Sequence, residues 1–194
     1  MTRNSRSGNS AWSRREFLAR TGATAAAVLG GLEVSRAAHA AGSDIIKVGM
    51  IGCGGRCSGA AAQALNTGPD VRLVAMCDIF ESKVKAAREN LKKIHPDKVI
   101  VDDDHCFVGL DGYKKVIEAS DVVLIACASK FHPMYSEEAI KAGKHVFVEK
   151  PHGIDPVGVR RMQAACDLAK EKGLSIVSGL QSRFDFGWQE CMKR

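Results

Sequence analysis

A glycine-rich run follows the apolar stretch 45–51 and carries residue types that bind phosphate. Gly52 would permit a tight turn, and Gly54 would let the backbone approach a pyrophosphate at the positive N-terminus of a helix. Cys57 replaces the third glycine of the G-x-G-x-x-G pattern, so we expect Gly59 to supply the close packing between helix and strand. A glycine-rich turn without a ligand is the alternative. The run is Gly52-Cys53-Gly54-Gly55-Arg56-Cys57.

A carboxylate follows the next apolar stretch. Asp78 lies 24 residues after Gly54, near the spacing expected for a carboxylate that accepts both adenosine-ribose hydroxyls. Its charge would repel a 2′-phosphate, and Ile79 and Phe80 offer no arginine to receive one. The sequence therefore predicts NAD as the cofactor, with NADP less favoured. Asp78 would also suit the role of a cap for the next helix, and the two roles are compatible.

Two further loops are expected to reach the same place. The first follows the apolar run 122–127 and would pass beside the nicotinamide half of a dinucleotide. The second contains Lys150, and a partly desolvated lysine at a strand end has the chemistry to assist proton transfer. A surface lysine before a proline turn is the alternative. The two loops are Cys127-Ala128-Ser129-Lys130-Phe131-His132-Pro133 and Glu149-Lys150-Pro151.

Alternating strand and helix patterns must position these loops. Apolar, β-branched runs predict strands at 45–51, 71–77, 99–101, 122–127, 145–148 and 174–178. Helical patterning and breakers predict helices at 56–65, 80–94, 112–119, 134–142 and 155–172. This alternation indicates an α/β fold with a doubly wound parallel sheet, the Rossmann type. Right-handed crossovers would then place every loop described above at the carboxyl ends of the strands.

The N-terminal forty residues have the features of an export signal. They contain Ser13-Arg14-Arg15-Glu16-Phe17-Leu18, an Ala-, Thr- and Gly-rich stretch at 21–32, and the small-residue cleavage site Ala38-His39-Ala40. The stretch is too short for a stable membrane span, which needs about 20 apolar residues. We predict a twin-arginine signal peptide at 1–40, recognition by the twin-arginine translocation machinery, and a periplasmic location. A disordered basic tail and an uncleaved anchor are the alternatives.

Charge and cysteine content narrow the function classes. The net charge is +6, of which residues 1–40 carry +4 and the remainder +2, so a nucleic-acid partner is not expected. The seven cysteines form no C-x-x-C pair. We expect most of them to be buried thiols that act as small apolar residues, and we expect neither a disulfide framework nor a metal site.

Together these motifs resemble the Gfo/Idh/MocA family of oxidoreductases over about residues 45–194. The most specific string is Ala142-Gly143-Lys144-His145-Val146-Phe147-Val148-Glu149-Lys150-Pro151, and Gly179-Leu180-Gln181-Ser182-Arg183-Phe184 is also similar to a family segment. The resemblance implies hydride transfer between a nicotinamide and a carbinol carbon of a sugar, inositol or related polyol. Lys150 would contact substrate and nicotinamide and support proton transfer, and Glu149 and Pro151 would shape its loop. His132 and Arg183 would lie near the cofactor.

The resemblance also implies a second α+β domain. The sequence stops shortly after the last predicted strand, so we expect an NAD-binding Rossmann domain at 41–178 and the start of a truncated C-terminal domain at 179–194. A homo-oligomer is expected only with the missing domain. Two alternatives to an exported polyol oxidoreductase stay open, an NAD-dependent glycosidase on the same scaffold and a non-catalytic dinucleotide-binding module.

Overall fold

The computed structural model describes residues 45–193, which form a six-stranded parallel sheet. The strand order is β3-β2-β1-β4-β5-β6, and every neighbouring pair is parallel. The strands are β1 (Ile46–Ile51), β2 (Val71–Asp78), β3 (Cys106–Val108), β4 (Val122–Ile125), β5 (His145–Val148) and β6 (Ile176–Ser178). This order is the doubly wound Rossmann arrangement, and it confirms the predicted fold class.

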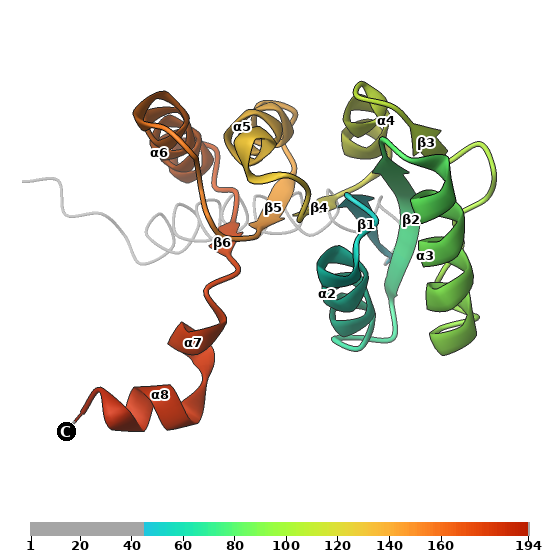
Figure 1. Cartoon of the computed structure of the whole chain (residues 1–194), viewed down its shortest axis with the longest axis horizontal. Coiled ribbons are helices and arrows are strands. Elements are labelled where there is room, and N and C mark those ends of the chain that lie inside the picture. Colours follow the sequence, from blue (N-terminus) through green and yellow to red (C-terminus); the bar gives the residue numbers. More distant parts are fainter. Residues whose placement is uncertain (1–44, 194) are drawn as a thin grey trace, which may run out of the picture. The chain divides into compact units, whose positions relative to one another are not determined.

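Helices cover both faces of the sheet (Figure 1). On one face lie α2 (Gly55–Leu65) and α3 (Glu81–Ile94). On the other lie α4 (Gly112–Ala119), α5 (His132–Lys141) and α6 (Pro156–Glu171). A short 3₁₀ turn, η1 (Ser129–Phe131), leads into α5, and two short helices, α7 (Gln181–Phe184) and α8 (Phe186–Cys191), follow β6.

The sheet separates two hydrophobic clusters. In β4, Leu124 packs into the cluster beneath α2 and α3, whereas Val123 and Ile125 pack into the cluster beneath α4, α5 and α6. This split follows from the pleat, which sends successive side chains to opposite faces. A strand covered on both faces must be apolar at every position, which explains the continuous Val-Val-Leu-Ile run.

The helix boundaries follow local rules that the sequence displays. The side chain of Asp155 accepts a hydrogen bond from the backbone N–H of Gly158 at 2.7 Å, and Pro156 occupies the first turn of α6. Gly143 and Gly173 follow α5 and α6 with φ of 77° and 66°, a conformation that is strained for other residues. These boundaries agree with the predictions to within two residues.

The third strand was predicted at the wrong place. The segment 99–101 forms only an isolated bridge, between Val99 and Leu73, and β3 forms later, at Cys106–Val108. Val99 and Val101 are buried and β-branched, which is why the pattern favoured a strand there. Between the two segments the Oδ1 atom of Asp102 accepts from the backbone N–H of His105 at 2.9 Å, and this turn delays the ladder.

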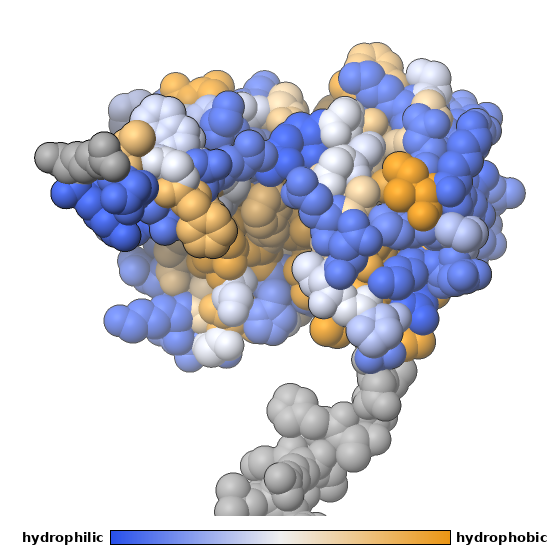
Figure 2. Space-filling view, turned by 90° about the horizontal axis from the view of Figure 1, so that it is seen from below, coloured by the Kyte–Doolittle hydropathy of each residue, from blue (hydrophilic) through white to orange (hydrophobic). Residues whose placement is uncertain are grey.

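The half of the sheet at β5 and β6 is open on the α2 side. Val177 is 44% exposed, and with Phe147 and Phe184 it lines a hollow of about 410 Å³ that also touches Arg56. Figure 2, which views this side, shows apolar surface gathered in a hollow between polar rims.

Residues from Ile45 onward form one compact unit. The predicted signal peptide lies outside the described residues, and the predicted boundary between 178 and 179 stays a prediction. Between residues 45 and 193, no helix has the length and hydropathy needed to cross a membrane. All seven cysteines are free thiols. Burial was expected for most of them, but only three are buried, two are half-buried (Cys106 and Cys127) and two are exposed (Cys166 and Cys191).

Candidate functional site

The candidate site is a crevice at the carboxyl ends of β1 and β4. These strands are neighbours in the sheet, but the helices that follow them, α2 and α5, lie on opposite faces. Chains that leave in opposite directions open a gap between their loops, and this is where doubly wound proteins bind ligands. Two cavities occupy the crevice, and they share Ala126 and Cys127.

The glycine loop has the backbone geometry predicted for a phosphate cradle. Gly52 adopts φ 96°, and a Cβ atom there would lie 2.8 Å from the carbonyl oxygen of Ala126. A Cβ atom on Gly54 or Gly55 would meet nothing within 4 Å, so these glycines border open space. Helix α2 begins at Gly55 with neither a capping side chain nor an acidic residue in its first turn. Its first N–H groups are therefore free to bind an anion.

Gly59 does not have the packing role that the sequence suggested. A Cβ atom at Gly59 would meet nothing within 4 Å, which shows that no strand approaches it closely. Cys57 is fully buried instead, and its Sγ lies 3.7 Å from the carbonyl oxygen of Ile51 and 3.8 Å from that of Leu124. The thiol is small enough to fill the contact between α2 and the sheet.

Asp78 ties its own loop to the glycine loop. Its Oδ2 atom accepts from the backbone N–H of Cys53 at 2.8 Å, and its Oδ1 atom accepts from that of Phe80 at 3.1 Å. The second bond closes a turn two residues long, and the N-cap residue of α3, Phe80, makes no side-chain capping hydrogen bond. The carboxylate also lines the first cavity, of about 270 Å³, with lone pairs left for a ligand.

An aromatic wall on this first cavity was missed by the sequence reasoning. Tyr113 and Tyr135 stack with ring centroids 4.3 Å apart, and Phe131 stacks on Tyr135 at 5.5 Å. All three line the cavity, and burial raises the pKa of Tyr135 to about 12. Such a wall suits a flat heteroaromatic ring such as adenine. Phe131 and Tyr135 are four residues apart at the start of α5, but Tyr113 comes from α4, so the sequence did not reveal that the three rings meet.

The loop after β4 continues the crevice toward the second cavity, of about 760 Å³. Cys127 lines both cavities and Ala128 lines the first, whereas Ser129 opens η1 and lines neither. Burial raises the pKa of the Cys127 thiol to about 12, so it is neutral at physiological pH. Cys127 therefore acts as a small wall residue.

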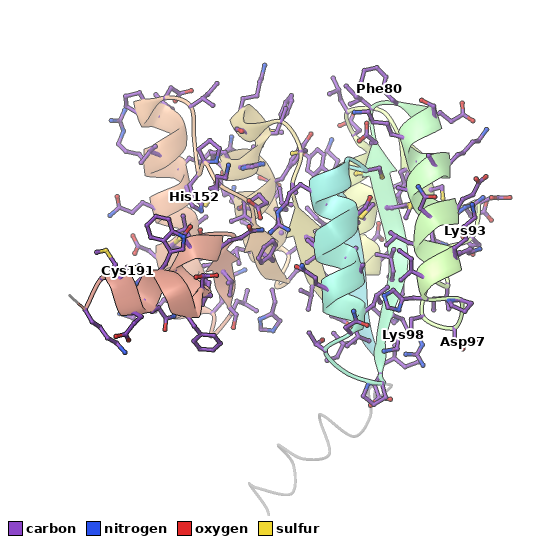
Figure 3. The ribbon with its side chains drawn as sticks, turned by 60° about the horizontal axis from the view of Figure 1, so that its bottom comes forward. Phe80, Lys93, Asp97, Lys98, His152 and Cys191 are labelled. Carbon is purple, nitrogen blue, oxygen red and sulfur yellow. The ribbon has the colours of Figure 1, made fainter. Side chains whose placement is uncertain are left out.

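His132 holds two loops of the crevice together. Its ring is 1% exposed, with Nδ1 2.9 Å from the carbonyl oxygen of Pro151 and Nε2 3.1 Å from that of Cys127. Both ring nitrogens therefore face the backbone, although the ring borders the second cavity. His152, labelled in Figure 3, adds a further tie through Nε2, which lies 2.7 Å from Oγ of Ser178.

The loop after β5 presents Lys150 to the second cavity. Lys150 is exposed, and Arg183 lines the same cavity from α7. Glu149 is 5% exposed and forms an ion pair with Arg56, whose Nε donates to Oε1 at 2.6 Å. The Oε2 atom of Glu149 accepts from the backbone N–H of Lys150 at 3.2 Å. The loop carrying the lysine is thus anchored to the start of α2.

The structure brings most of the predicted site residues to one crevice. The first cavity is lined by Gly52, Gly54, Asp78, Cys127 and Ala128, and the second by Arg56, Cys127, His132, Glu149, Lys150 and Arg183. Cys53, Gly55, Ser129 and Pro151 line neither cavity, and Cys53 and Pro151 act through their backbone bonds. An uncapped helix start, a carboxylate and an aromatic wall along one crevice fit a dinucleotide.

Comparison with known proteins agrees with this geometry. Residues 46–179 match the model of a family described as "Oxidoreductase family, NAD-binding Rossmann fold". The chain is 28% identical over 152 residues to a D-glucoside 3-dehydrogenase of Escherichia coli. This match covers 78% of this chain and 39% of that protein. The chain is also 32% identical over 111 residues to a glycosyl hydrolase family 109 protein of Bacteroides fragilis, and this match covers 56% of this chain and 23% of that protein.

Solved structures show the same fold. The myo-inositol 2-dehydrogenase of Lactobacillus plantarum superposes with a TM-score of 0.62 at 25% identity, covering 77% of this chain and 40% of that one. The scyllo-inositol dehydrogenase of Lactobacillus casei, solved with NAD(H) and scyllo-inositol, gives 0.59 at 23% identity and the same coverage, a likeness of fold alone. The chain spans 40% or less of the length of these relatives.

Proposed function

Because the chain belongs to the Gfo/Idh/MocA oxidoreductase family, we propose that it forms the NAD-binding part of an exported oxidoreductase that acts on a sugar, inositol or related polyol by hydride transfer. The observation that carries the proposal is the placement of three features along one crevice. These are the open glycine loop at Gly54, the carboxylate of Asp78, and the exposed Lys150.

Each feature has a separate task in this proposal. The free N–H groups at the start of α2 bind the pyrophosphate, and Asp78 accepts the ribose hydroxyls. The aromatic wall of Tyr113, Phe131 and Tyr135 stacks on the adenine. When bound, the dinucleotide supplies a nicotinamide ring that exchanges hydride with the substrate carbon. Lys150 lies at the second cavity, where its ammonium group would exchange a proton with the substrate hydroxyl.

Asp78 supports a preference for NAD over NADP. A 2′-phosphate would place its negative charge beside this carboxylate, which is already held by two backbone N–H groups and cannot turn away without breaking them. The cation at this end of the cavity is Lys83, which offsets part of that repulsion. We therefore expect the chain to bind NAD more tightly than NADP, and the ratio of the two dissociation constants measures this preference.

The proposal includes export by the twin-arginine route. That route carries folded proteins, and free thiols at all seven cysteines suit folding in the reducing cytoplasm. A dinucleotide is not expected outside the cytoplasm, so we propose that it is bound before export and held tightly. Purified periplasmic protein should begin at Ala41 and contain nicotinamide nucleotide. An intact Met1, or nucleotide-free protein that binds NAD only weakly, would contradict this part.

A glycosidase is the second candidate, because several relatives are glycosyl hydrolase family 109 proteins. In such chemistry the sugar would be oxidised transiently, the aglycone eliminated and the product reduced again, so the dinucleotide would be recycled. Net NADH formation with a free polyol would support the oxidoreductase. Cleavage of an aryl glycoside without net NADH formation would support the glycosidase.

The decisive experiment separates binding from turnover. The purified chain is titrated with NADH by fluorescence, and the Lys150→Ala variant is titrated beside it. We expect both to bind with affinities within about threefold of each other, since Lys150 lies at the substrate end of the crevice. Polyol oxidation is assayed in a protein that joins this chain to the second α+β domain that the resemblance implies, and we expect it to be lost in the Lys150→Ala variant. NADH binding without turnover by that two-domain protein would favour a non-catalytic binding module, and an absence of NADH binding would refute the proposal.

A further inference from the structure

The buried carboxylate of Glu149 lies where three segments meet. It belongs to the loop after β5, it pairs with Arg56 from the first turn of α2, and it packs against Gly179 at the end of β6. A Cβ atom at Gly179 would lie 2.3 Å from Oε1 of Glu149, so only glycine leaves room for the carboxylate. The chain therefore reserves this space for one charged group.

Arg56 uses its donors on protein groups. Its Nε and Nη2 atoms donate to Oε1 of Glu149. In the amide orientation that matches donors with acceptors, the side-chain oxygen of Gln181 accepts from Nη1 at 3.2 Å and from Nη2 at 2.9 Å. A guanidinium held on both sides has little capacity left for a phosphate, although Arg56 lies in the run predicted to bind the cofactor.

The remaining bond of Glu149 leads to Lys150. Its Oε2 atom accepts from the backbone N–H of Lys150, while the side chain of Lys150 extends to the second cavity. An unpaired buried carboxylate attracts the nearest flexible cation, because burial without a partner is costly. Besides Arg56, the cations that line the second cavity with Glu149 are Lys150, the next residue of the chain, and Arg183. If Arg56 were absent, we expect Lys150 to turn toward the carboxylate.

We infer that Arg56 is a positioning residue: by neutralising Glu149 it keeps the ammonium group of Lys150 free for the substrate. The importance of a free Lys150 rests on the proposed function, but the position of its ammonium group does not. Competitive acetylation measures that position without any turnover. Trace acetic anhydride is added to the purified 194-residue chain, and labelling of Lys150 is compared by mass spectrometry with that of Lys93 on α3 (Figure 3).

The Arg56→Gln variant should label at Lys150 about three- to tenfold more slowly than the unaltered chain, because its ammonium group pairs with Glu149. The Arg56→Gln/Glu149→Gln double variant should recover normal labelling, since the orphaned charge is gone. Arg161→Gln is the matched control, because it breaks an Arg–Glu pair between α6 and α5 and should leave Lys150 unchanged.

NADH titration of the same variants tests the alternative role of Arg56, that of a phosphate ligand. The double variant should bind NADH within about threefold of the unaltered chain if Arg56 acts only through Glu149. A loss of tenfold or more that Glu149→Gln does not restore would make Arg56 a phosphate ligand and overturn the inference. Unchanged labelling of Lys150 in Arg56→Gln would also overturn it.

Two further outcomes are covered by this design. Should Arg56→Gln fail to fold, Arg56→Met, which keeps a long side chain but removes the charge that pairs with Glu149, must slow Lys150 labelling, and normal labelling there counts against the inference. Should no variant bind NADH, the proposed function fails, while the labelling series still decides the role of Arg56.

Discussion

Replacing Asp78 by Asn tests the adenosine end of the crevice. The carboxylate accepts from the backbone N–H groups of Cys53 and Phe80 and also faces the first cavity. Asn has nearly the same shape, but one oxygen becomes an NH₂ donor and the charge disappears. The amide can therefore satisfy one of the two backbone N–H groups but not both, and it is a poorer acceptor for ribose hydroxyls.

The size of the effect follows from these bonds. A hydrogen bond to a charged group contributes about 1.5–3 kcal/mol. Loss of one such bond to the ribose corresponds to roughly 10- to 150-fold weaker NADH binding, since about 1.4 kcal/mol is a factor of ten. NADPH should gain relative to NADH, because the repulsive carboxylate is gone and Lys83 lines the same cavity.

Fluorescence titration of the full chain with NADH and with NADPH measures both changes. Asp102→Asn is the matched control, since it removes an aspartate with a comparable backbone bond, to His105, in the turn before β3. Circular dichroism confirms that each variant is folded. NADH affinity within twofold of the unaltered chain in a folded Asp78→Asn protein would refute the assigned role.

Two predictions concern stability. Gly179→Ala should lower the free energy of unfolding by about 1–3 kcal/mol, because its methyl group would collide with Glu149. Gly59→Ala faces open space within α2 and should raise the free energy of unfolding by about 0.5–1 kcal/mol. Urea unfolding measures both, and equal effects would contradict the packing described. Burial raises the pKa of several thiols, those of Cys77 and Cys127 to about 12, so the unfolded chain loses their protons first. Stability should therefore fall as pH rises from about 9 toward 12, by up to about 1.4 kcal/mol per pH unit and thiol. Urea unfolding between these pH values measures the change. A free energy of unfolding that does not vary with pH, or one that falls equally steeply in the Cys77→Ala chain, would count against this prediction. The thiols whose pKa is raised most are Cys53, Cys57, Cys77 and Cys127.

The sequence predicted the features that depend on neighbours along the chain. The cap at Asp155, the glycine at 143 and the continuous apolar run of β4 are each decided within a few residues, and all three were predicted. The order of motifs also placed the loops, because parallel strands with right-handed crossovers bring all their carboxyl ends to one edge.

Contacts between distant segments were not predictable in this way. Arg56 and Glu149 lie 93 residues apart, and nothing in either segment identifies the other as its partner. The stacking of Tyr113 on Tyr135 depends in the same way on how α4 and α5 pack against the sheet. The misplaced third strand has the opposite cause, since a local β-branched pattern at 99–101 was outweighed by the turn at Asp102.

Because β1 and β4 lie at the centre of the sheet, the residues of the crevice come from two separate stretches of sequence. Residues 46–119 contribute the glycine loop, Asp78 and Tyr113, whereas residues 122–183 contribute Lys150, Arg183 and the other two rings of the aromatic wall, Phe131 and Tyr135. The junction at Ser120 is thus a natural crossover point for recombination between homologues. A chimera joined there would inherit its nucleotide preference from one parent and its reacting lysine from the other, provided that both parents keep the arginine and glutamate that join the two halves.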